Sequence, residues 1–315
     1  MRIIRTFEGL EAADRGAAVA MGNFDGVHRG HRSVIELARE EAAKNGWPLG
    51  IITFEPHPRS FFAPEAPPFR LMNAEARAHR LEMLGVALLY ELVFDARLAS
   101  MSAETFAAEV LARGLGVAHV VVGNDFRFGK GRQGDVAALA ALGRRHGFGV
   151  TAARLVANGG TDLSSTAIRR ALSEGRPEEA AQMLGHWHRI EGQVETGDRR
   201  GRLLGFPTAN LSLEGLHLPR FGVYAVGVDV LEGPHRGHYP GAASIGTRPT
   251  FGENRPNLEV HLLDFAGDLY DAHMSVALVA FLRPELRFPS TEALIAQMAA
   301  DCAEARRILA TAPRP

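Results

Sequence analysis

A regular alternation of two hydrophobic patterns is the feature that most limits how the first half of this chain can fold. Short apolar runs typical of buried strands are followed by stretches in which apolar residues recur with helical spacing. The runs occupy residues 17–21, 49–54, 86–94, 119–122 and 149–155, and the helical patterns occupy 31–44, 73–84, 102–113 and 135–146. This alternation predicts right-handed βαβ units and a parallel sheet covered by helices on both faces.

The pattern changes near residue 185. Helical patterns over 166–174 and 177–184 precede the change, and short strands with many Gly and Pro residues follow it. Residues 222–230 and 258–265 alternate between apolar and polar positions, and 274–282 is a further expected strand. This half predicts a small antiparallel barrel or sandwich, closed by a C-terminal helix from about 291 to 309. The expected fold class is therefore α/β plus all-β, in two domains.

Composition excludes several classes of protein. With 315 residues and a net charge of −1, the chain has room for a substantial core and no overall basic field to attract nucleic acid. The N-terminal segment lacks a signal-peptide core, and no apolar run reaches the roughly 18 residues of a membrane span. Cys302 is the single cysteine, and a buried thiol in a reducing compartment is expected. We therefore expect a cytoplasmic protein.

The first apolar run leads into VAMGNFDGVHRGHRSVIELARE, residues 19–40, where a glycine-rich turn connects a strand to a helix. Ligands of open parallel sheets bind beyond the carboxyl ends of the strands, and a helix N-terminus at that edge favours a phosphate. Gly30 lets a ligand approach the main chain, and His28 and His31 share one helical face. Both can donate hydrogen bonds to phosphoryl oxygens, more strongly if protonated. Surface histidines or half of a zinc site are the alternatives, but the strand–turn–helix context favours phosphate.

Longer strings extend this motif into a family resemblance. An HxGH motif after a strand resembles the signature of the nucleotidyltransferase superfamily. Four segments together resemble the adenylyltransferase half of bacterial bifunctional riboflavin kinase/FAD synthetases: GNFDGVHRGH (22–31), TFEPHP (53–58), GNDFRFGKG (123–131) and LSSTAIRRAL (163–172). Four others resemble the kinase half: GRLLGFPTANL (201–211), FGVYAV (221–226), SIGTRPTF (244–251) and LEVHLLDF (258–265). The resemblance implies a Rossmann-like FMN adenylyltransferase domain over 1–184 and a riboflavin kinase barrel over 185–315.

The resemblance implies that the N-terminal domain transfers AMP from ATP to FMN, which gives FAD and pyrophosphate. His28, His31 and Arg169 are the expected catalytic residues, with the histidines and the SSTAIR segment gripping ATP from two sides. The expected ATP- and FMN-binding residues are Gly22, Asn23, Phe24, Asp25, Gly30, Phe54, His57, Pro58, Asp125, Phe126, Arg127, Phe128, Ser164, Ser165 and Thr166. The alternative for Ser164 is a plain helix cap, and the alternative for Asn23 and Asp25 is turn formation. Phe126 or Phe128 could instead belong to the core.

For the C-terminal domain the resemblance implies transfer of the γ-phosphate of ATP to riboflavin, with Glu259 as the base. Thr208 and Asn210 lie two apart on an extended segment, so their side chains face the same way, and their neutral oxygens suit Mg²⁺ together with ATP phosphates. The other expected ATP- and riboflavin-binding residues are Gly201, Arg202, Gly205, Phe206, Pro207, Tyr224 and Arg248. ATP, riboflavin and FMN are the expected partners, with no nucleic acid or membrane, and the oligomeric state is left open.

The chain departs from the family's pattern at residues 185–188, Ser244 and Asp271, which leaves the details of the flavin pocket and linker open. Three other interpretations remain. Only one domain could be active, or the N-terminal domain could serve another phosphate monoester. The chain could be a flavin-binding module with decayed chemistry, although both motif sets are intact. A relative of the aminoacyl-tRNA synthetases is disfavoured by the net charge and by the lack of an anticodon-binding domain.

Overall fold

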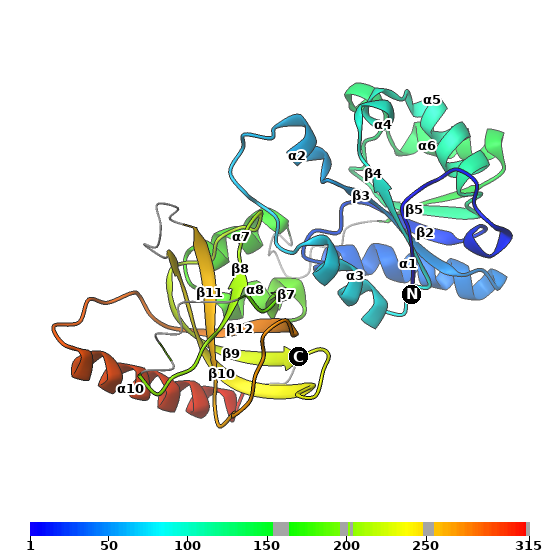
Figure 1. Cartoon of the computed structure of the whole chain (residues 1–315). Coiled ribbons are helices and arrows are strands. Elements are labelled where there is room, and N and C mark those ends of the chain that lie inside the picture. The colour runs from blue at the N-terminus through cyan, green and yellow to red at the C-terminus, as the bar shows by residue number, and fades with distance from the viewer. Residues whose placement is uncertain (154–163, 196–200, 202–203, 248–254, 313–315) are drawn as a thin grey trace. The chain divides into compact units, whose positions relative to one another are not determined.

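The computed structural model describes residues 1–153, 164–195, 201, 204–247 and 255–312 (Figure 1). Backbone contacts divide the chain into two compact units, the first made of Met1–Pro67 and Arg77–Thr161 and the second of Pro68–Ala76 and Asp162–Pro315. The boundary between these units therefore falls earlier than the change of sequence pattern near residue 185. The helices that precede residue 185 pack with the second unit, as does a short excursion of the chain at Pro68–Ala76.

The first unit is built on a six-stranded sheet in the order β1-β4-β3-β2-β5-β6, with every neighbouring pair parallel. A parallel sheet needs a crossover between successive strands, which the helical stretches of the sequence supply. β2 lies at the centre, and the order reverses between β2 and β5. The strands are β1 (Arg2–Ile4), β2 (Ala18–Met21), β3 (Leu49–Glu55), β4 (Leu88–Val93), β5 (His119–Gly123) and β6 (Gly149–Ala153).

Helices cover both faces of this sheet (Figure 1). Val19 and Met21 of β2 join a core with Val110 and Leu111, and the alternate side chains of β2 face α1. α1 begins after His28 and ends at Gly46, whose φ of 69° makes a left-handed helix cap. The helices are α1 (Arg29–Asn45), α2 (Pro58–Phe62), α3 (Ala74–Met83), α4 (Ala96–Ser100), α5 (Ala103–Thr105), the π-helical η2 (Phe106–Gly114) and α6 (Val136–His146), with 3₁₀ turns η1 (Ala12–Asp14) and η3 (Lys130–Arg132).

The second unit is a six-stranded antiparallel sheet in the order β7-β12-β9-β10-β11-β8. A bridge between Glu195 and Asn210 links its two ends, so the sheet curls into a nearly closed barrel rather than a sandwich. Tyr224, Val226 and Val228 alternate along β9 and point into the barrel core. The strands are β7 (His188–Gln193), β8 (Ala209–Ser212), β9 (Gly222–Val230), β10 (Gly237–Thr247), β11 (Pro256–Leu262) and β12 (His273–Arg283).

Among the described residues, the helices that complete the second unit are α7 (Ser165–Ser173), α8 (Pro177–Leu184) and α10 (Thr291–Leu309). Ile168 and Leu172 of α7 pack with Met183 and Leu184 of α8 around Leu71, which comes from the excursion at Pro68–Ala76. α10 packs on β9 and β10 through Ala305. The predicted fold class, a parallel α/β half and an antiparallel barrel with a C-terminal helix, is confirmed. Within the described part of the chain, no helix is long and apolar enough to cross a membrane.

Candidate active sites

The carboxyl edge of the parallel sheet brings two of the predicted motifs together. β2 and β5 are paired neighbours, and the strand order reverses between them. The turn that follows β2 carries HxGH, and the loop that follows β5 carries GNDFRFG. Open α/β sheets bind ligands in the crevice at such a reversal, because the loops on its two sides diverge. The sequence motifs therefore lie at the place where this topology provides a ligand site.

The turn after β2 is tightly wound and anchored. Phe24 and Val27 are both buried and have positive φ angles of 51° and 41°, values that bulky residues rarely adopt. Thr53 of β3 donates a hydrogen bond from Oγ1 to the carbonyl oxygen of Asn23 at 3.3 Å. Asp25 is also buried in this turn. Unusual backbone of this kind persists where the surrounding structure holds it, and it clusters at functional sites.

His28 and His31 form a compact pair at the start of α1. The ring centroids lie 3.7 Å apart and the planes are inclined by 16°, so the imidazoles stack. His28 is the N-cap residue, and its Nδ1 accepts a hydrogen bond from the backbone N–H of His31 at 3.3 Å. A nitrogen that accepts carries no proton, so a neutral His28 holds its proton on Nε2. In that tautomer Nε2–H is the donor group of the His28 ring.

The electrostatics of the pair favour a neutral imidazole at His31. Burial lowers the pKa of His31 well below its usual value, and the neighbouring His28 lowers that pKa further. Two stacked imidazolium rings would also repel each other. The expectation that protonation strengthens the grip on phosphate is therefore not supported for His31. The structure instead presents a neutral His31 at a helix N-terminus, whose dipole supplies positive potential.

A row of contacting phenylalanine rings runs from the end of β3 through the segment after β4 and the start of η2 to the loop after β5. Phe54 contacts Phe94 edge-on at a centroid distance of 5.8 Å and Phe106 at 6.4 Å. Phe106 contacts Phe128 at 6.0 Å, and Phe126 stacks on Phe128 at 5.8 Å. Phe94 and Phe106 were missed by the sequence analysis, because nothing in the sequence shows that they meet Phe54 and Phe128. The result is an aromatic cluster in which Phe106 and Phe128 belong to the buried core, as the alternative for Phe128 expected, while Phe126 is partly exposed.

Other predicted residues of this edge have more ordinary surroundings. Nδ1 of His57 accepts a hydrogen bond from the N–H of Arg59 at 3.0 Å, and Pro58 is the first residue of α2, so both shape this short helix. Asp125 and Arg127 are exposed, and Arg127 lies 3.8 Å from the carboxylate of Asp135. Exposed charges remain available to a ligand. Gly22 and Gly30 are partly buried at the two ends of the turn.

The SSTAIR segment belongs to the second unit. Ser164 caps α7 by accepting a hydrogen bond from the N–H of Ala167 at 3.2 Å, while Ser165 and Thr166 form its first turn. Arg169 donates from Nε to the carbonyl oxygen of Phe69 at 2.6 Å, and its guanidinium lies 5.4 Å from the centre of the Phe69 ring. Phe69 thus holds the Arg169 side chain through its carbonyl oxygen and its ring.

On the barrel, the predicted base and one predicted metal ligand are direct neighbours. Glu259 of β11 is paired with Asn210 of β8 in the antiparallel ladder, so both side chains leave the same face of the sheet. Leu211 and Leu258, one residue away on each strand, point into the barrel core. Glu259 and Asn210 therefore lie on the outer face. The side-chain amide of Asn257 donates to Oε1 of Glu259 at 3.4 Å.

A tight turn leads into β8 beside this pair. The carbonyl oxygen of Gly201 accepts from the N–H groups of Leu204 and Phe206 at 3.1 and 2.8 Å. A Cβ on Gly201 would lie 2.3 Å from the carbonyl oxygen of Phe206, so only glycine fits, and Gly205 has a φ of 85°. Nδ1 of His261 donates to the carbonyl oxygen of Pro207 at 2.8 Å. The sequence analysis missed His261, which stands two residues after Glu259 on the same face.

The oxygen donors of this site fit a hard divalent cation. Thr208, Asn210 and Glu259 offer a hydroxyl, an amide carbonyl and a carboxylate, which are ligand types that Mg²⁺ accepts alongside water and nucleotide phosphates. Thr208 precedes β8 by one residue, and its Oγ1 lies 3.5 Å from the position of a Cβ on Gly201. Searched over the described residues, the chain has no group of three or more His, Cys, Asp or Glu side chains able to hold a metal.

Some predicted kinase residues do not lie beside Glu259 and Asn210 in the described structure. Tyr224 is 1% exposed in the barrel core, where it packs edge-on against Phe281 and its hydroxyl donates to the carbonyl oxygen of Arg220. The structure thus gives Tyr224 a packing role, because its alternation along β9 points it inward. Arg202 and Arg248 lie outside the described residues. Ser244, a departure from the family pattern, pairs with Glu259 across β10 and β11 and so borders the site.

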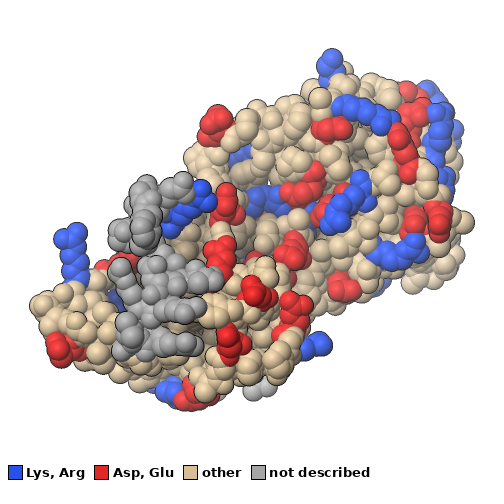
Figure 2. Space-filling model, in the orientation of Figure 1, with Lys and Arg blue, Asp and Glu red and all other residues tan. Residues whose placement is uncertain are grey.

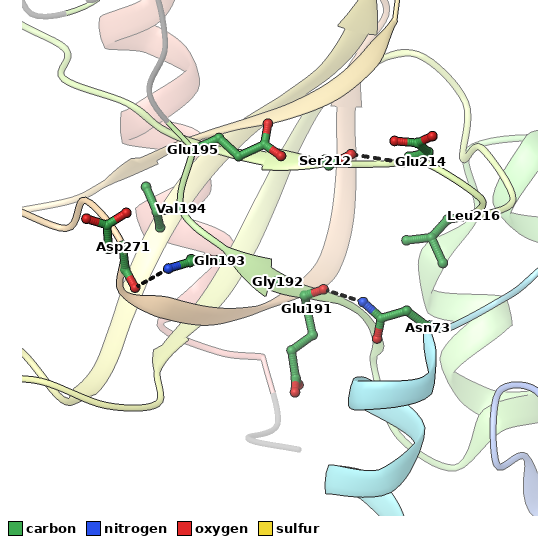
Figure 3. A pocket seen from close by; sticks show the side chains of 10 residues that line it. All are labelled: Asn73, Glu191, Gly192, Gln193, Val194, Glu195, Ser212, Glu214, Leu216 and Asp271. Carbon is green, nitrogen blue, oxygen red and sulfur yellow. Dashed lines mark hydrogen bonds between the residues drawn. The ribbon is translucent and has the colours of Figure 1, made fainter. Parts of the chain in front are cut away.

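A cavity of about 370 Å³ opens on the second unit (Figure 3). Its lining includes the carboxylates of Glu191, Glu195, Glu214 and Asp271, and no predicted site residue contributes to it. The side-chain amide of Asn73 donates to the carbonyl oxygen of Glu191 at 2.8 Å, which ties the excursion of the chain to β7. The acidic lining disfavours a phosphate ligand. On the face drawn in Figure 2, acidic and basic side chains are interspersed, as the net charge of −1 leads one to expect.

The folds and sites together define a nucleotide-dependent transferase with two reaction centres. Residues 10–167 match the FAD synthetase family, and residues 184–309 match the riboflavin kinase family. A Pseudomonas fluorescens protein named bifunctional riboflavin kinase/FMN adenylyltransferase is 44% identical over 98% of each chain. Its Escherichia coli K12 namesake is 42% identical over 97% of each. The chain therefore belongs to the bifunctional riboflavin kinase/FMN adenylyltransferase family.

A solved structure extends the likeness to the fold. A Streptococcus pneumoniae chain described as a macrolide-efflux protein superposes with a TM-score of 0.82 at 30% sequence identity, covering 97% of this chain and 98% of that one. The likeness therefore includes both halves of the molecule.

Proposed function

We propose that this chain phosphorylates riboflavin to FMN on its barrel and then adenylylates FMN to FAD, with residues 1–184 supplying the adenylyltransferase and 185–315 the kinase. One observation carries the proposal: two pairs of side chains suited to different transfer reactions lie on two different folds. The histidine pair stands at the switch point of a parallel sheet, and Glu259 stands opposite Asn210 on a barrel wall. Membership of the family supports both activities.

In the adenylyl transfer, a phosphate oxygen of FMN attacks the α-phosphorus of ATP. A new P–O bond forms as the bond to the bridging oxygen of pyrophosphate breaks. The FMN phosphate is already ionised at neutral pH, so the protein needs to position the reactants and stabilise charge rather than remove a proton. His28 and His31 donate hydrogen bonds to ATP phosphates, His31 as a neutral imidazole. Ser165, Thr166 and Arg169 neutralise the leaving pyrophosphate.

We assign flavin recognition to the partly exposed members of the aromatic cluster described above, Phe54 and Phe126. Phe54 and Phe128 are linked through Phe106, and Phe126 stacks on Phe128 at the loop after β5. An isoalloxazine ring is a flat aromatic system, and offset or edge-on contacts with phenylalanine stabilise it. The exposed Asp125 and Arg127 can hold the polar parts of the ligand. These assignments place the flavin beside the loop that the sequence motif already indicated.

In the kinase reaction, the 5′-hydroxyl of riboflavin attacks the γ-phosphorus of ATP. Its proton passes to the carboxylate of Glu259, and the bond from the γ-phosphorus to the β,γ-bridging oxygen breaks to release ADP. When Mg²⁺ is bound, it neutralises phosphate charge in this transfer. Thr208 and Asn210 would hold it together with ATP phosphates, and the turn at Gly201–Pro207 would cover those phosphates.

A reducing cytoplasm is the compartment that we propose for both reactions. The single cysteine, Cys302, is half-buried, and burial together with the nearby Asp301 raises the pKa of its thiol. A thiol with a raised pKa is a weak nucleophile, so a packing role on α10 suits it.

Separate assays of the two half-reactions test the assignment. We expect H28A and H31A to lower FAD formation from supplied FMN by about 10²-fold or more, as loss of a preorganised donor does, while FMN formation from riboflavin persists. E259Q keeps the size of Glu259 and removes its basicity, so we expect it to do the reverse. Flavins separated by chromatography after incubation with ATP and Mg²⁺ give both rates.

Two results would contradict the proposal. Loss of both activities in a folded single variant would show that the reactions are not divided between the two motif sets. Turnover of another phosphate monoester in preference to FMN would leave the site in place but change the acceptor.

A further inference from the structure

The helix that carries SSTAIR is fastened by a closed circuit of hydrogen bonds. Arg169 donates from Nε to the carbonyl oxygen of Phe69 at 2.6 Å. The next residue, Arg70, accepts from the backbone N–H of His217 at 2.7 Å. The side chain of His217 returns to α7, with Nε2 at 2.9 Å from the carbonyl oxygen of Arg169. Three segments more than 40 residues apart in the sequence thus meet at one arginine.

The partners of His217 determine where its proton lies. A carbonyl oxygen only accepts hydrogen bonds, so Nε2 of His217 must carry a proton and donate to Arg169. Oγ of Ser173 lies 3.0 Å from the same nitrogen and, one turn further along α7, shares this donor. The imidazole therefore holds two points of the helix that are four residues apart. Its contact with Arg169 is through the backbone carbonyl oxygen and does not involve the guanidinium group.

The surrounding segment strengthens the attachment. Arg220 donates from its backbone N–H to the carbonyl oxygen of Leu172 at 2.9 Å. Arg70 and Leu216 form a parallel bridge beside it. Leu213–Arg220 follows β8 directly, and β8 bears Asn210 of the kinase site. A segment of the riboflavin kinase family region therefore fixes a helix whose motif belongs to the adenylyltransferase.

We propose that His217 is a positioning residue for adenylyl transfer, acting by fixing the backbone of Arg169 so that its guanidinium meets the departing pyrophosphate. The inference rests on the proposed role of Arg169 and adds a contribution from the kinase half to the other reaction. A charge that must neutralise pyrophosphate in the transition state loses effect when its backbone shifts, since catalysis depends on preorganised geometry. The kinase reaction does not use Arg169 and is unaffected.

Substitutions of His217 in the full-length chain test this. H217F keeps a ring and removes the donor, and H217Q keeps a donor at similar reach. We expect H217F to lower kcat for FAD formation from supplied FMN by about tenfold, the equivalent of one lost hydrogen bond. In the reverse reaction of FAD with pyrophosphate, KM for pyrophosphate should rise, and H217Q should restore both. S173A, which removes only the second acceptor, is the matched control and should stay near wild type.

The outcomes separate this inference from the function on which it rests. Riboflavin phosphorylation by H217F reports on folding of the same compact unit, so a parallel fall in both activities would show a merely structural role and overturn the proposal. R169M is measured alongside. If R169M loses FAD formation and H217F does not, the positioning role alone is wrong. If R169M retains FAD formation, the assignment of the pyrophosphate site fails first.

Discussion

At the scale of single residues, the histidine pair shows how surroundings decide chemistry. The sequence places His28 and His31 at a helix start, and that much could be predicted from spacing alone. Which nitrogen bears the proton could not, because it depends on the contact between the N–H of His31 and Nδ1 of His28. The lowered pKa of His31 likewise comes from packing that no motif encodes. Residue identity could be read from the sequence, whereas protonation state required the fold.

His188 gives a prediction about stability at this scale. It is buried in β7, and burial, with His186 and His217 nearby, lowers its pKa to about 3. The unfolded chain binds this proton near pH 6.5 and the folded chain does not. The contribution of neutral His188 to the free energy of unfolding is thus complete above about pH 6.5 and is lost as the pH falls towards 3. The loss amounts to about 1.4 kcal/mol per pH unit.

Urea unfolding at pH 7, 6 and 5 measures this dependence, followed by the fluorescence of the adjacent Trp187 in a W47F background. H188L removes the titrating group. The free energy of unfolding should therefore decrease less between pH 7 and pH 5 in H188L than in its parent, whatever the effect of the substitution at pH 7. Equal slopes for H188L and its parent would show that His188 is not the group responsible.

At the scale of elements, sequence patterns located most strands but missed strands, such as β10, whose residues do not alternate clearly between apolar and polar. β9 alternates clearly and was predicted over its full length, as was the C-terminal helix. β10 contains three glycines and a proline in GHYPGAASIGT and has no clear alternation, yet it pairs with both β9 and β11. Pairing on two sides outweighs its weak strand propensity. Similarly, only the fold could show that Asn210 meets Glu259.

Gly50 of β3 offers a test of an element that supports a site. A Cβ at this position would lie 2.9 Å from Cγ1 of Val19 and 3.0 Å from Cβ of Ala17. G50A should therefore displace β2, the strand that leads into the histidine turn, and lower the free energy of unfolding by about 1–3 kcal/mol. We expect FAD formation to fall more than FMN formation. G192A, where nothing lies within 4 Å of the added carbon, is the control, and a similar effect from G192A would refute the steric explanation.

At the scale of the whole molecule, each of the two compact units is made of two segments that are separated in the sequence. Pro68–Ala76 clusters with the barrel although the chain on both sides of it belongs to the sheet, and α7 clusters with the barrel although its motif belongs to the adenylyltransferase. Sequence patterns marked the change near residue 185 because periodicity changes there. They could not reveal the earlier boundary, since helices look alike in sequence whichever core they cover.

A truncation tests this arrangement. A fragment of residues 1–184 retains every adenylyltransferase motif but loses the contacts of Arg169 with His217 and of Leu172 with Arg220. We expect it to form FAD from FMN at less than about a tenth of the rate of the full chain, since a single lost positioning contact has that effect. Circular dichroism would confirm that its sheet persists. An intact rate from this fragment would show that α7 needs no support from the barrel.

The excursion at Pro68–Ala76 also determines the order in which contacts can form during synthesis of the chain. Asn73 hydrogen-bonds to Glu191, which is 118 positions later in the chain. A ribosome adding about 5–20 residues per second delivers that partner roughly 10 s after Asn73 emerges. During that interval the buried side chains of Phe69 and Leu71 have no barrel to cover them. A growing chain can therefore complete this contact only after the first strand of its barrel has been made.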